Sequence, residues 1–407
     1  MSGTASRSGN AGVIRLLTFL MFMMFAMTTD SVGVIIPQII RDYHLGLTAA
    51  GSFHYATMAA IALSGLLLGF LADRLGRKRT IILGLVIFAC DACLFASGGS
   101  FGYFVVLLMI SGTAIGVFKT GALALIGDLS SSTTEHTSTM NTVEGFFGVG
   151  AIIGPLLVTA LLARGIAWQW LYVIAGGVCV LLILTALAVR YPQPKHSGDE
   201  PVDLRGTLRM MTNGYAVAFG LAALLYVAVE CAIYVWMPTL LLDYHGGAAF
   251  IAAYALSIFF VLRAGGRFLG AWMLRHFQWS GVLAFCGLCI LLCFVGSLLG
   301  GVTLAVFLLP LSGLFMSVVY PTINSKGISC FAKVQHGTVA GVILFFTALG
   351  AVLGPLAMGA VSDHWGGVRY GFMLACALAV LLFALTLFNW MARPVAGRLQ
   401  TLERSEY

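Results

Sequence analysis

The chain has 407 residues, of which 60% are hydrophobic and only 9% are charged, and its formal net charge is +7. A soluble globular domain carries about 25% charged residues, so most of this chain does not face water. The surplus of Lys and Arg is typical of the cytoplasmic edges of a membrane protein, and no nucleic-acid partner is expected.

The cysteines are interpreted as packing residues. All nine lie in apolar stretches, and the two pairs with CxxC spacing, Cys90/Cys93 and Cys286/Cys289, have no histidine nearby. Thiols in such surroundings behave as small hydrophobic groups, so we expect no metal, cofactor or disulfide. The apolar run after Arg15 is too long for a cleavable signal peptide and has no small-residue cleavage site.

Apolar runs long enough to cross a bilayer follow one another along the chain, which predicts an all-α polytopic membrane fold with twelve transmembrane helices. Their expected cores are residues 14–37, 50–71, 80–98, 103–125, 141–163, 168–190, 214–241, 249–273, 280–300, 303–324, 338–360 and 371–391. The one long polar stretch, residues 191–209, is expected to link a six-helix half of residues 1–190 to a second half of residues 210–407.

The distribution of cations predicts the orientation. If both termini are cytoplasmic, sixteen Lys and Arg residues lie at or beyond the cytoplasmic helix ends and three lie outside. The sixteen are Arg7, Arg15, Arg74, Arg77, Lys78, Arg79, Arg190, Lys195, Arg205, Arg209, Arg275, Lys326, Lys333, Arg393, Arg398 and Arg404. The positive-inside rule therefore predicts cytoplasmic termini and a cytoplasmic linker.

Short motifs repeat between the halves at an offset close to 200 positions. The stretch Gly150–Leu156 (GAIIGPL) recurs as Gly350–Leu356 (GAVLGPL), and Asp30 recurs as Glu230, each shortly before a proline. Two parallel six-helix repeats imply a substrate site near the bilayer midplane and transport by alternating access.

A glycine-rich and cation-rich motif follows the second predicted span and reads GFLADRLGRKR. It resembles the signature of the major facilitator superfamily between helices two and three, which in that family latches the cytoplasmic side. The resemblance implies a gating role for Gly69, Asp73, Arg74, Gly76 and Arg77. A weaker copy in the second half (GRFLGAWMLR) adds Arg267.

Four stretches carry a finer resemblance, to the fucose/glucose-galactose:proton symporter branch of this superfamily. They are Gly116–Thr120 (GVFKT), Tyr226–Glu230 (YVAVE), Gly313–Ile323 (GLFMSVVYPTI) and the acid Asp30 in span one. The resemblance implies proton-coupled sugar transport. One departure is notable: the branch has a carboxylate on helix four where this chain has Lys119, which puts coupling through that pair in question.

Five charged residues are expected inside spans one, four, five, seven and eight: Asp30, Lys119, Glu144, Glu230 and Arg263. A charge at the bilayer midplane costs about 2.5–3.5 kcal/mol on insertion scales, so each is expected to be paired or functional. Salt bridges such as Asp30–Lys119 and Glu230–Arg263 are the structural alternative to substrate binding.

The candidate residues fall into two groups. Substrate binding is expected from Lys119, Glu144, Tyr226, Glu230, Arg263, Tyr320 and Asn324. Proton coupling is expected from Asp30 and Glu230. Asp91, in span three, is expected to make an interhelical hydrogen bond instead. Amides and carboxylates bind sugar hydroxyls, while aromatic faces cover the CH patches of a sugar ring.

The sequence favours a monomeric secondary transporter for a small polar solute, a sugar or sugar derivative, in a bacterial-type inner (plasma) membrane. Two transporter alternatives remain: an organic-anion carrier using Lys119 and Arg263, and a drug-efflux antiporter. A membrane sensor or scaffold is disfavoured because the chain carries no appended soluble domain. An enzyme is not expected, and the absence of a GxxxxGK[ST] motif argues against an ATP-driven pump.

Overall fold

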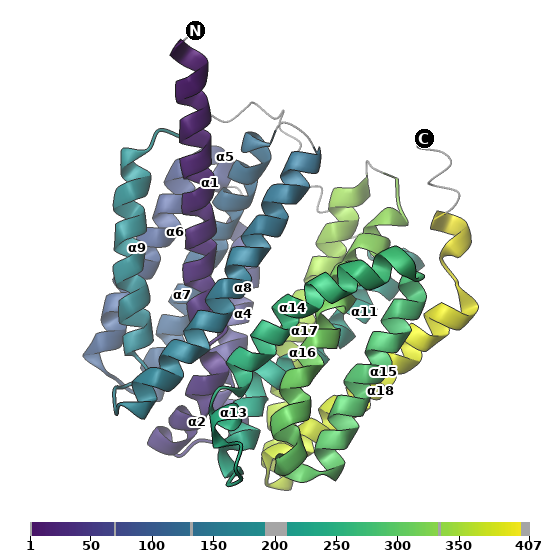
Figure 1. Ribbon diagram of the computed structural model, residues 1–407. Helices are drawn as coiled ribbons and strands as arrows, with labels where there is room; N and C mark the ends of the chain where they lie inside the picture. The colour runs from purple at the N-terminus through teal and green to yellow at the C-terminus, as the bar shows by residue number, and fades with distance from the viewer. Residues whose placement is uncertain (1, 69–70, 131–132, 192–209, 333–334, 400–407) are drawn as a thin grey trace. The chain divides into compact units, whose positions relative to one another are not determined.

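The computed structural model describes residues 2–68, 71–130, 133–191, 210–332 and 335–399. The regular elements in these segments are all helical (Figure 1). By internal contacts the chain divides into two compact units, which are described separately below.

Unit 1 comprises residues 1–44 and 52–198. Its helices are α1 (Ser2–Thr29), α2 (Val32–Tyr43), α4 (Ser52–Leu68), α5 (Leu71–Arg74), α6 (Arg77–Leu94), η1 (Phe95–Ser97), α7 (Phe101–Leu129), α8 (Thr133–Ala163) and α9 (Trp170–Ala188). In Figure 1 they run from purple to teal.

Unit 2 comprises residues 45–51 and 199–407. Its helices are α3 (Leu47–Ala50), α11 (Gly214–Cys231), the π-helix η2 (Ala232–Trp236), α12 (Met237–Leu240), η3 (Leu241–Asp243), α13 (Ala249–Ala253), α14 (Ala255–His276), α15 (Trp279–Leu299), α16 (Gly301–Ser329), α17 (His336–Trp365) and α18 (Val368–Ala392). Most of the expected linker, residues 192–209, lies outside the described segments.

The predicted all-α polytopic fold is confirmed. Eleven helical segments of the described residues are long and apolar enough to cross a membrane, and each coincides with a predicted span. The twelfth predicted span, 50–71, is occupied by α4, which has 17 apolar-rich residues. Residues 69–70, which follow it, are outside the described segments.

The packing pattern of unit 1 is repeated in unit 2. In unit 1, α1 packs on α8, α4 on α7, and α6 on both α7 and α9. In unit 2 the corresponding helices do the same: α11 packs on α17, α14 on α16, and α15 on both α16 and α18. The two units are therefore built on one helical plan.

Glycines of the repeated GAxxGP motif allow close approach of the helices in both units. A Cβ atom at Gly154 of α8 would lie 2.2 Å from the carbonyl oxygen of Met27 on α1. A Cβ atom at Gly354 of α17 would lie 2.7 Å from Cα of Ala228 on α11. Small residues let membrane helices pack backbone to backbone, so the motif serves helix packing in both units, as its recurrence suggested.

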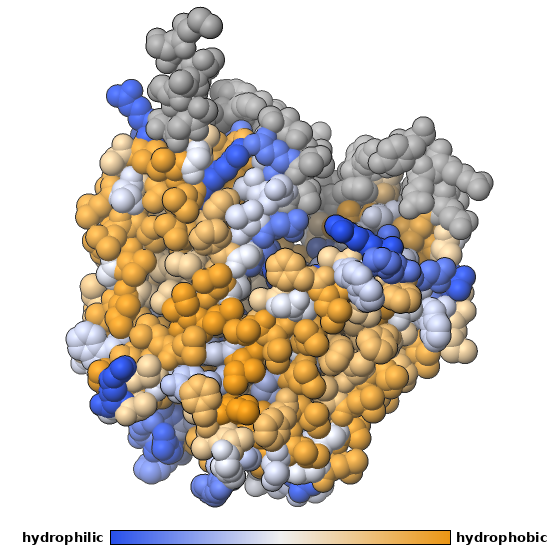
Figure 2. Space-filling model, in the orientation of Figure 1, coloured by the Kyte–Doolittle hydropathy of each residue, from blue (hydrophilic) through white to orange (hydrophobic). Residues whose placement is uncertain are grey.

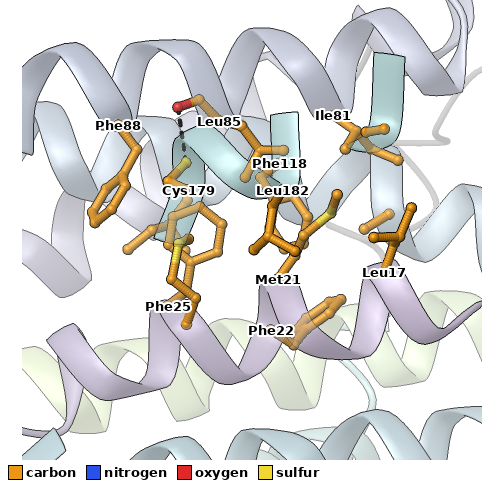
Figure 3. Close-up of a cluster of buried hydrophobic side chains, with 14 of the residues drawn as sticks. Leu17, Met21, Phe22, Phe25, Ile81, Leu85, Phe88, Phe118, Cys179 and Leu182 are labelled. Carbon is orange, nitrogen blue, oxygen red and sulfur yellow. Dashed lines mark hydrogen bonds between the residues drawn. The ribbon is translucent and has the colours of Figure 1, made fainter. Parts of the chain in front are cut away.

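Apolar side chains fill the space between helices α1, α6, α7 and α9 of unit 1 (Figure 3). The rings of Phe25 and Phe88 meet edge to face, with centroids 5.0 Å apart, and Phe118 packs 4.8 Å from Phe25. The thiol of Cys179 donates a hydrogen bond to the carbonyl of Leu85 at 3.2 Å. This cysteine is thus a packing residue, as expected.

The outer surface of the helices is also apolar (Figure 2). Leu299 exposes 84% of its surface and Phe268 exposes 82%. Side chains of this kind rarely form large exposed patches in water. The hydrocarbon core of a lipid bilayer is itself apolar and accommodates such side chains. Helices suit this environment because their backbone polar groups form hydrogen bonds within each helix.

Candidate substrate and proton-coupling sites

The helix that carries Glu230 is irregular directly after that residue. The α-helix α11 ends at Cys231, and the chain continues as the π-helix η2 before α12 begins. Pro238, in the first turn of α12, has no N–H to donate to the carbonyl four residues earlier, which favours an irregular helix here. π-Helical turns frequently occur at functional sites.

Glu230 lies at the centre of a polar cluster inside unit 2. The Arg263 guanidinium Nη2, from α14, is 2.8 Å from Glu230 Oε1. The hydroxyl of Tyr226, one turn earlier on α11, lies 2.8 Å from the same oxygen. The Glu230 side chain is only 7% exposed and that of Arg263 is 26% exposed. A charge this deep in apolar surroundings requires a partner, and Arg263 supplies it.

The Tyr226 hydroxyl also connects the cluster to α16. It lies 2.8 Å from the backbone carbonyl oxygen of Met316, so its single proton is shared between that oxygen and Glu230. The rings of Tyr226 and Tyr320 are nearly parallel, with centroids 6.2 Å apart and an interplanar angle of 24°. Thr347 of α17 donates a 3.5 Å hydrogen bond to the Tyr320 hydroxyl.

Two further predicted residues of unit 2 lie near this cluster along their helices. Arg267 is one turn after Arg263 on α14, is exposed and acts electrostatically on Tyr226. Asn324 follows Tyr320 by one turn on α16 and is half-buried. The structure therefore brings Tyr226, Glu230 and Arg263 into direct contact, adds Tyr320 by stacking, and gives Asn324 no hydrogen bond to the described residues.

Asp30 of unit 1 lies inside the first membrane span, as expected, and stands at a break between two helices of that span. Helix α1 ends at Thr29 and α2 begins at Val32. The hydroxyl of Thr29 donates to Asp30 Oδ2 at 2.9 Å. The hydroxyl of Ser31 donates to the carbonyl of Met27 at 2.5 Å, and this side-chain hydrogen bond satisfies a carbonyl at the end of α1.

Lys119 of α7 does not form the salt bridge with Asp30 that the sequence allowed. Its ammonium group interacts electrostatically with Glu144 first and with Asp30 second, and it makes no close ion pair with any described carboxylate. It lies over the ring of Phe147, 5.5 Å from the ring centroid. Glu144 is exposed, whereas Lys119 and Asp30 are half-buried. These three charges thus form an open cluster.

The motif after span two is described only in part. Gly69 lies outside the described residues, and Asp73 lies in α5 with its side chain outside them. Arg74 ends α5 and is exposed. Gly76 has φ +84°, a conformation that only glycine adopts without strain, so it makes the turn between α5 and α6.

Arg77 holds this turn in place. Its Nε is 2.9 Å from Asp128 Oδ2 at the end of α7, and both side chains are nearly buried. Its Nη1 donates to the carbonyl of Ala72 at 3.0 Å. The arginine thus joins the motif turn to the neighbouring helix of its own unit.

Asp91 makes the predicted interhelical hydrogen bond. The hydroxyl of Ser111 on α7 donates to Asp91 Oδ2 on α6 at 2.5 Å, and both side chains are buried. The two residues lie apart from the candidate sites above, so Asp91 is a packing residue of unit 1.

Sequence reasoning missed three contacts of these sites. The ion pair of Asp128 with Arg77 was missed because no cation lies close to Asp128 in the sequence. A lone acid at the end of a predicted span, beside an arginine-rich loop, could have indicated this pair. Thr347 and the Met316 carbonyl gave no signal, because threonine is common in membrane helices and a backbone oxygen has no sequence signature.

Comparison with known proteins identifies the class. A family model described as Major Facilitator Superfamily matches residues 17–355. The chain therefore belongs to the major facilitator superfamily, and it is a multi-pass membrane transporter.

Individual relatives are more distant. The L-fucose-proton symporter of Escherichia coli strain K12 is 24% identical, over 89% of this chain and 90% of that protein. The protein TsgA of Escherichia coli is also 24% identical, over 91% and 93% of the two chains. The crystal structure of the nucleoside transporter NupG superposes with a TM-score of 0.75 at 16% identity, covering 94% of this chain and 99% of that one. The expected resemblance to the fucose symporter branch is thus confirmed.

Proposed function

We propose that this chain is a proton-coupled secondary transporter of a neutral hydroxylated solute, a sugar or sugar derivative. The observation that carries the proposal is the cluster of Glu230, Arg263 and Tyr226 beside the stacked Tyr320. Charged and phenolic groups supply hydrogen bonds to hydroxyls, and the tyrosine rings supply an apolar face for sugar CH groups. The similarity to a fucose–proton symporter supports the same substrate class.

Transport would follow alternating access by rocking of the halves 1–190 and 210–407. Both termini and the linker are proposed to be cytoplasmic, which the count of cations supports. Cysteine tags at the N-terminus, near Lys195 and near the C-terminus should react only from the cytoplasmic side. Labelling of the linker from outside would contradict the orientation.

Proton coupling is assigned to Asp30, with Glu230 as the alternative carrier. Asp30 is half-buried at a helix break, where an acid can load and release a proton as access alternates. Asp30→Asn imitates the protonated acid, so it should abolish accumulation driven by a proton gradient while it preserves substrate counterflow. A variant that still concentrates substrate would transfer the role to Glu230.

The direct test is transport by the purified protein in liposomes, with and without a pH gradient, across sugars, sugar acids and organic anions. Uptake of neutral sugars that increases with an inward proton gradient is the expected result. Uptake confined to anions would contradict the sugar assignment.

One observation favours a second candidate, transport of an organic anion. Lys119 forms no close ion pair with a described carboxylate, so its charge is available to a substrate carboxylate or phosphate. Lys119→Glu separates the candidates, because it restores the acid expected at this position of the branch. A sugar carrier should keep some binding of neutral sugar, whereas an anion carrier should lose binding at every pH.

A further inference from the structure

A cavity of ≈ 260 Å³ lies at one end of unit 2. Its wall is formed by α12 and η3, by the last two turns of α15 and by the first turns of α16 and α18, where membrane spans end or begin. Every residue that lines it belongs to unit 2, so the cavity is complete within that unit. The lining is largely apolar and includes the buried rings of Phe294 and Phe372, with centroids 6.4 Å apart.

Two opposite charges line this apolar cavity. Asp243 of η3 and Arg369 of α18 are both exposed, so the cavity opens to the surface of the unit. Among the ion pairs of the described residues there is none between these two. The cavity is therefore dipolar, with a carboxylate from one helix and a guanidinium from another.

The guanidinium of Arg369 is held at the cavity wall. Its Nη2 donates to the carbonyl of Leu298, at the end of α15, over 3.4 Å. The last carbonyl groups of a helix have no partner within the helix and attract cations. This bond uses one of the five N–H groups of the arginine, and the others remain for a ligand.

Aromatic residues beside the cavity indicate its level in the membrane. Trp365 ends α17 and Tyr370 lies in the first turn of α18, and their ring centroids are 6.0 Å apart. Their exposed fractions are 63% and 38%. Tryptophan and tyrosine gather at the level of the lipid headgroups, where membrane meets water. The cavity thus lies at headgroup level, next to the exposed, lipid-compatible side chain of Leu299 at the end of α15.

We propose that this cavity binds the headgroup of a zwitterionic phospholipid that carries a primary ammonium group and a phosphate. Arg369 pairs with the phosphate, because the planar set of guanidinium donors matches phosphate oxygens. The ammonium group of the lipid donates to the carboxylate of Asp243. With the cytoplasmic termini proposed above, this lipid belongs to the extracytoplasmic leaflet.

The two charges together select this headgroup over related ones. An anionic headgroup without an amine gives Asp243 no donor and places its negative charge in the same cavity as the carboxylate. A quaternary ammonium headgroup has no N–H to donate. Phosphatidylethanolamine should therefore bind in preference to phosphatidylglycerol and phosphatidylcholine. This inference concerns a resident lipid and goes beyond the transported solute.

The first experiment is native mass spectrometry of the full chain in detergent, which requires no transport. The three phospholipids are added in turn, with identical acyl chains. Phosphatidylethanolamine should bind about fivefold more tightly than each of the other two, which is the upper range for an exposed ion pair. Equal affinity for all three lipids would overturn the proposal.

Charge variants assign the two poles of the site. Arg369→Gln should weaken the binding of all three lipids, since each has a phosphate. Asp243→Asn should remove the preference for phosphatidylethanolamine and leave the affinity for phosphatidylcholine unchanged. Arg164→Gln is the matched control, because Arg164 is also exposed and also donates to a helix-end carbonyl, that of Ala160, over 3.4 Å, but lies outside the cavity. A control as damaging as Arg369→Gln would contradict the assignment.

A third variant fills the cavity and keeps both charges. Val302, a half-buried lining residue in the first turn of α16, is replaced by tryptophan. Phosphatidylethanolamine should raise the midpoint of thermal unfolding of the parent protein, because a ligand that binds the folded state stabilises it. The same lipid should produce a smaller shift in Val302→Trp. An equal shift in both proteins would place the lipid elsewhere and overturn the site.

Discussion

The two units share one helical plan but differ at the carboxylate beside each broken helix. In unit 2, Glu230 is buried and is joined by Arg263 and Tyr226 at 2.8 Å each. In unit 1, Asp30 is half-buried beside the Thr29 hydroxyl, while Lys119 stays at electrostatic range. The duplicated backbone thus keeps the break and the acid, and the neighbouring side chains determine how firmly each acid is held.

The sequence explains the difference. At the repeat offset of 200 positions, Tyr226 of α11 corresponds to Ala26. On α14 the offset is 201, since Gly65 and Gly69 recur as Gly266 and Gly270, and Arg263 corresponds to Ala62. The alanine side chain cannot form a hydrogen bond to a carboxylate. The positions that supply side-chain partners to Glu230 in unit 2 therefore hold apolar side chains in unit 1.

The largest expected effect compares the two cations. Arg263→Met leaves the buried Glu230 without its charged partner and should destabilise the protein by about 3–5 kcal/mol. Lys119→Met removes a half-buried ammonium group that forms no close ion pair with a described carboxylate, and it should leave stability unchanged or higher. Thermal unfolding of both variants in detergent, followed by tryptophan fluorescence, measures this. An equal loss in both would show that Lys119 belongs to a strong pair and would remove the contrast between the units.

A smaller effect is expected from the repeated glycines. Gly154→Ala places a methyl group 2.2 Å from a carbonyl oxygen and should cost about 1–3 kcal/mol, and Gly354→Ala, at 2.7 Å from a Cα atom, should cost less. Gly148→Ala is the control, since nothing lies within 4 Å of its Cβ position. The same unfolding assay ranks the three. A control as damaging as Gly154→Ala would disprove the packing role.

The smallest effect concerns the tyrosines that only unit 2 possesses. Tyr226→Phe removes a buried hydrogen bond to Glu230 and should cost about 0.5–1.5 kcal/mol. Tyr320→Phe loses the hydrogen bond from Thr347, which at 3.5 Å is longer and weaker than the bond from Tyr226 to Glu230, and the loss of that bond should cost less. Both variants keep the aromatic ring and lose one hydroxyl. A fall in sugar affinity with Tyr226→Phe therefore measures the contribution of that hydroxyl to binding. A larger loss of stability from Tyr320→Phe would reverse the assignment of the central hydroxyl.

Each predicted span coincides with a helical segment, because a span needs about 20 apolar residues whatever its neighbours are. The helix ends were predicted less well, since α1 begins at Ser2 and α8 at Thr133, before the predicted cores 14–37 and 141–163. The sequence repeat correctly matched the GAxxGP motifs of the two units, which lie on corresponding helices. The ion pair between Glu230 and Arg263 was anticipated as one alternative. The break at Asp30 was missed. A turn of two residues leaves no trace in hydropathy, and Pro37 lies seven residues beyond it.

The sequence by itself determined the membrane class, the spans, the internal repeat and the charged residues that need partners, since these depend on composition and period alone. Only the tertiary structure decided which charges meet. Arg263 and Glu230 are 33 positions apart, and the Tyr226 hydroxyl reaches the Met316 carbonyl across 90. Contacts of this kind depend on helix rotation and on backbone carbonyl groups, and neither property has a signature in one sequence. For that reason the transporter was recognisable from its sequence, whereas the link from Tyr226 to α16 was not.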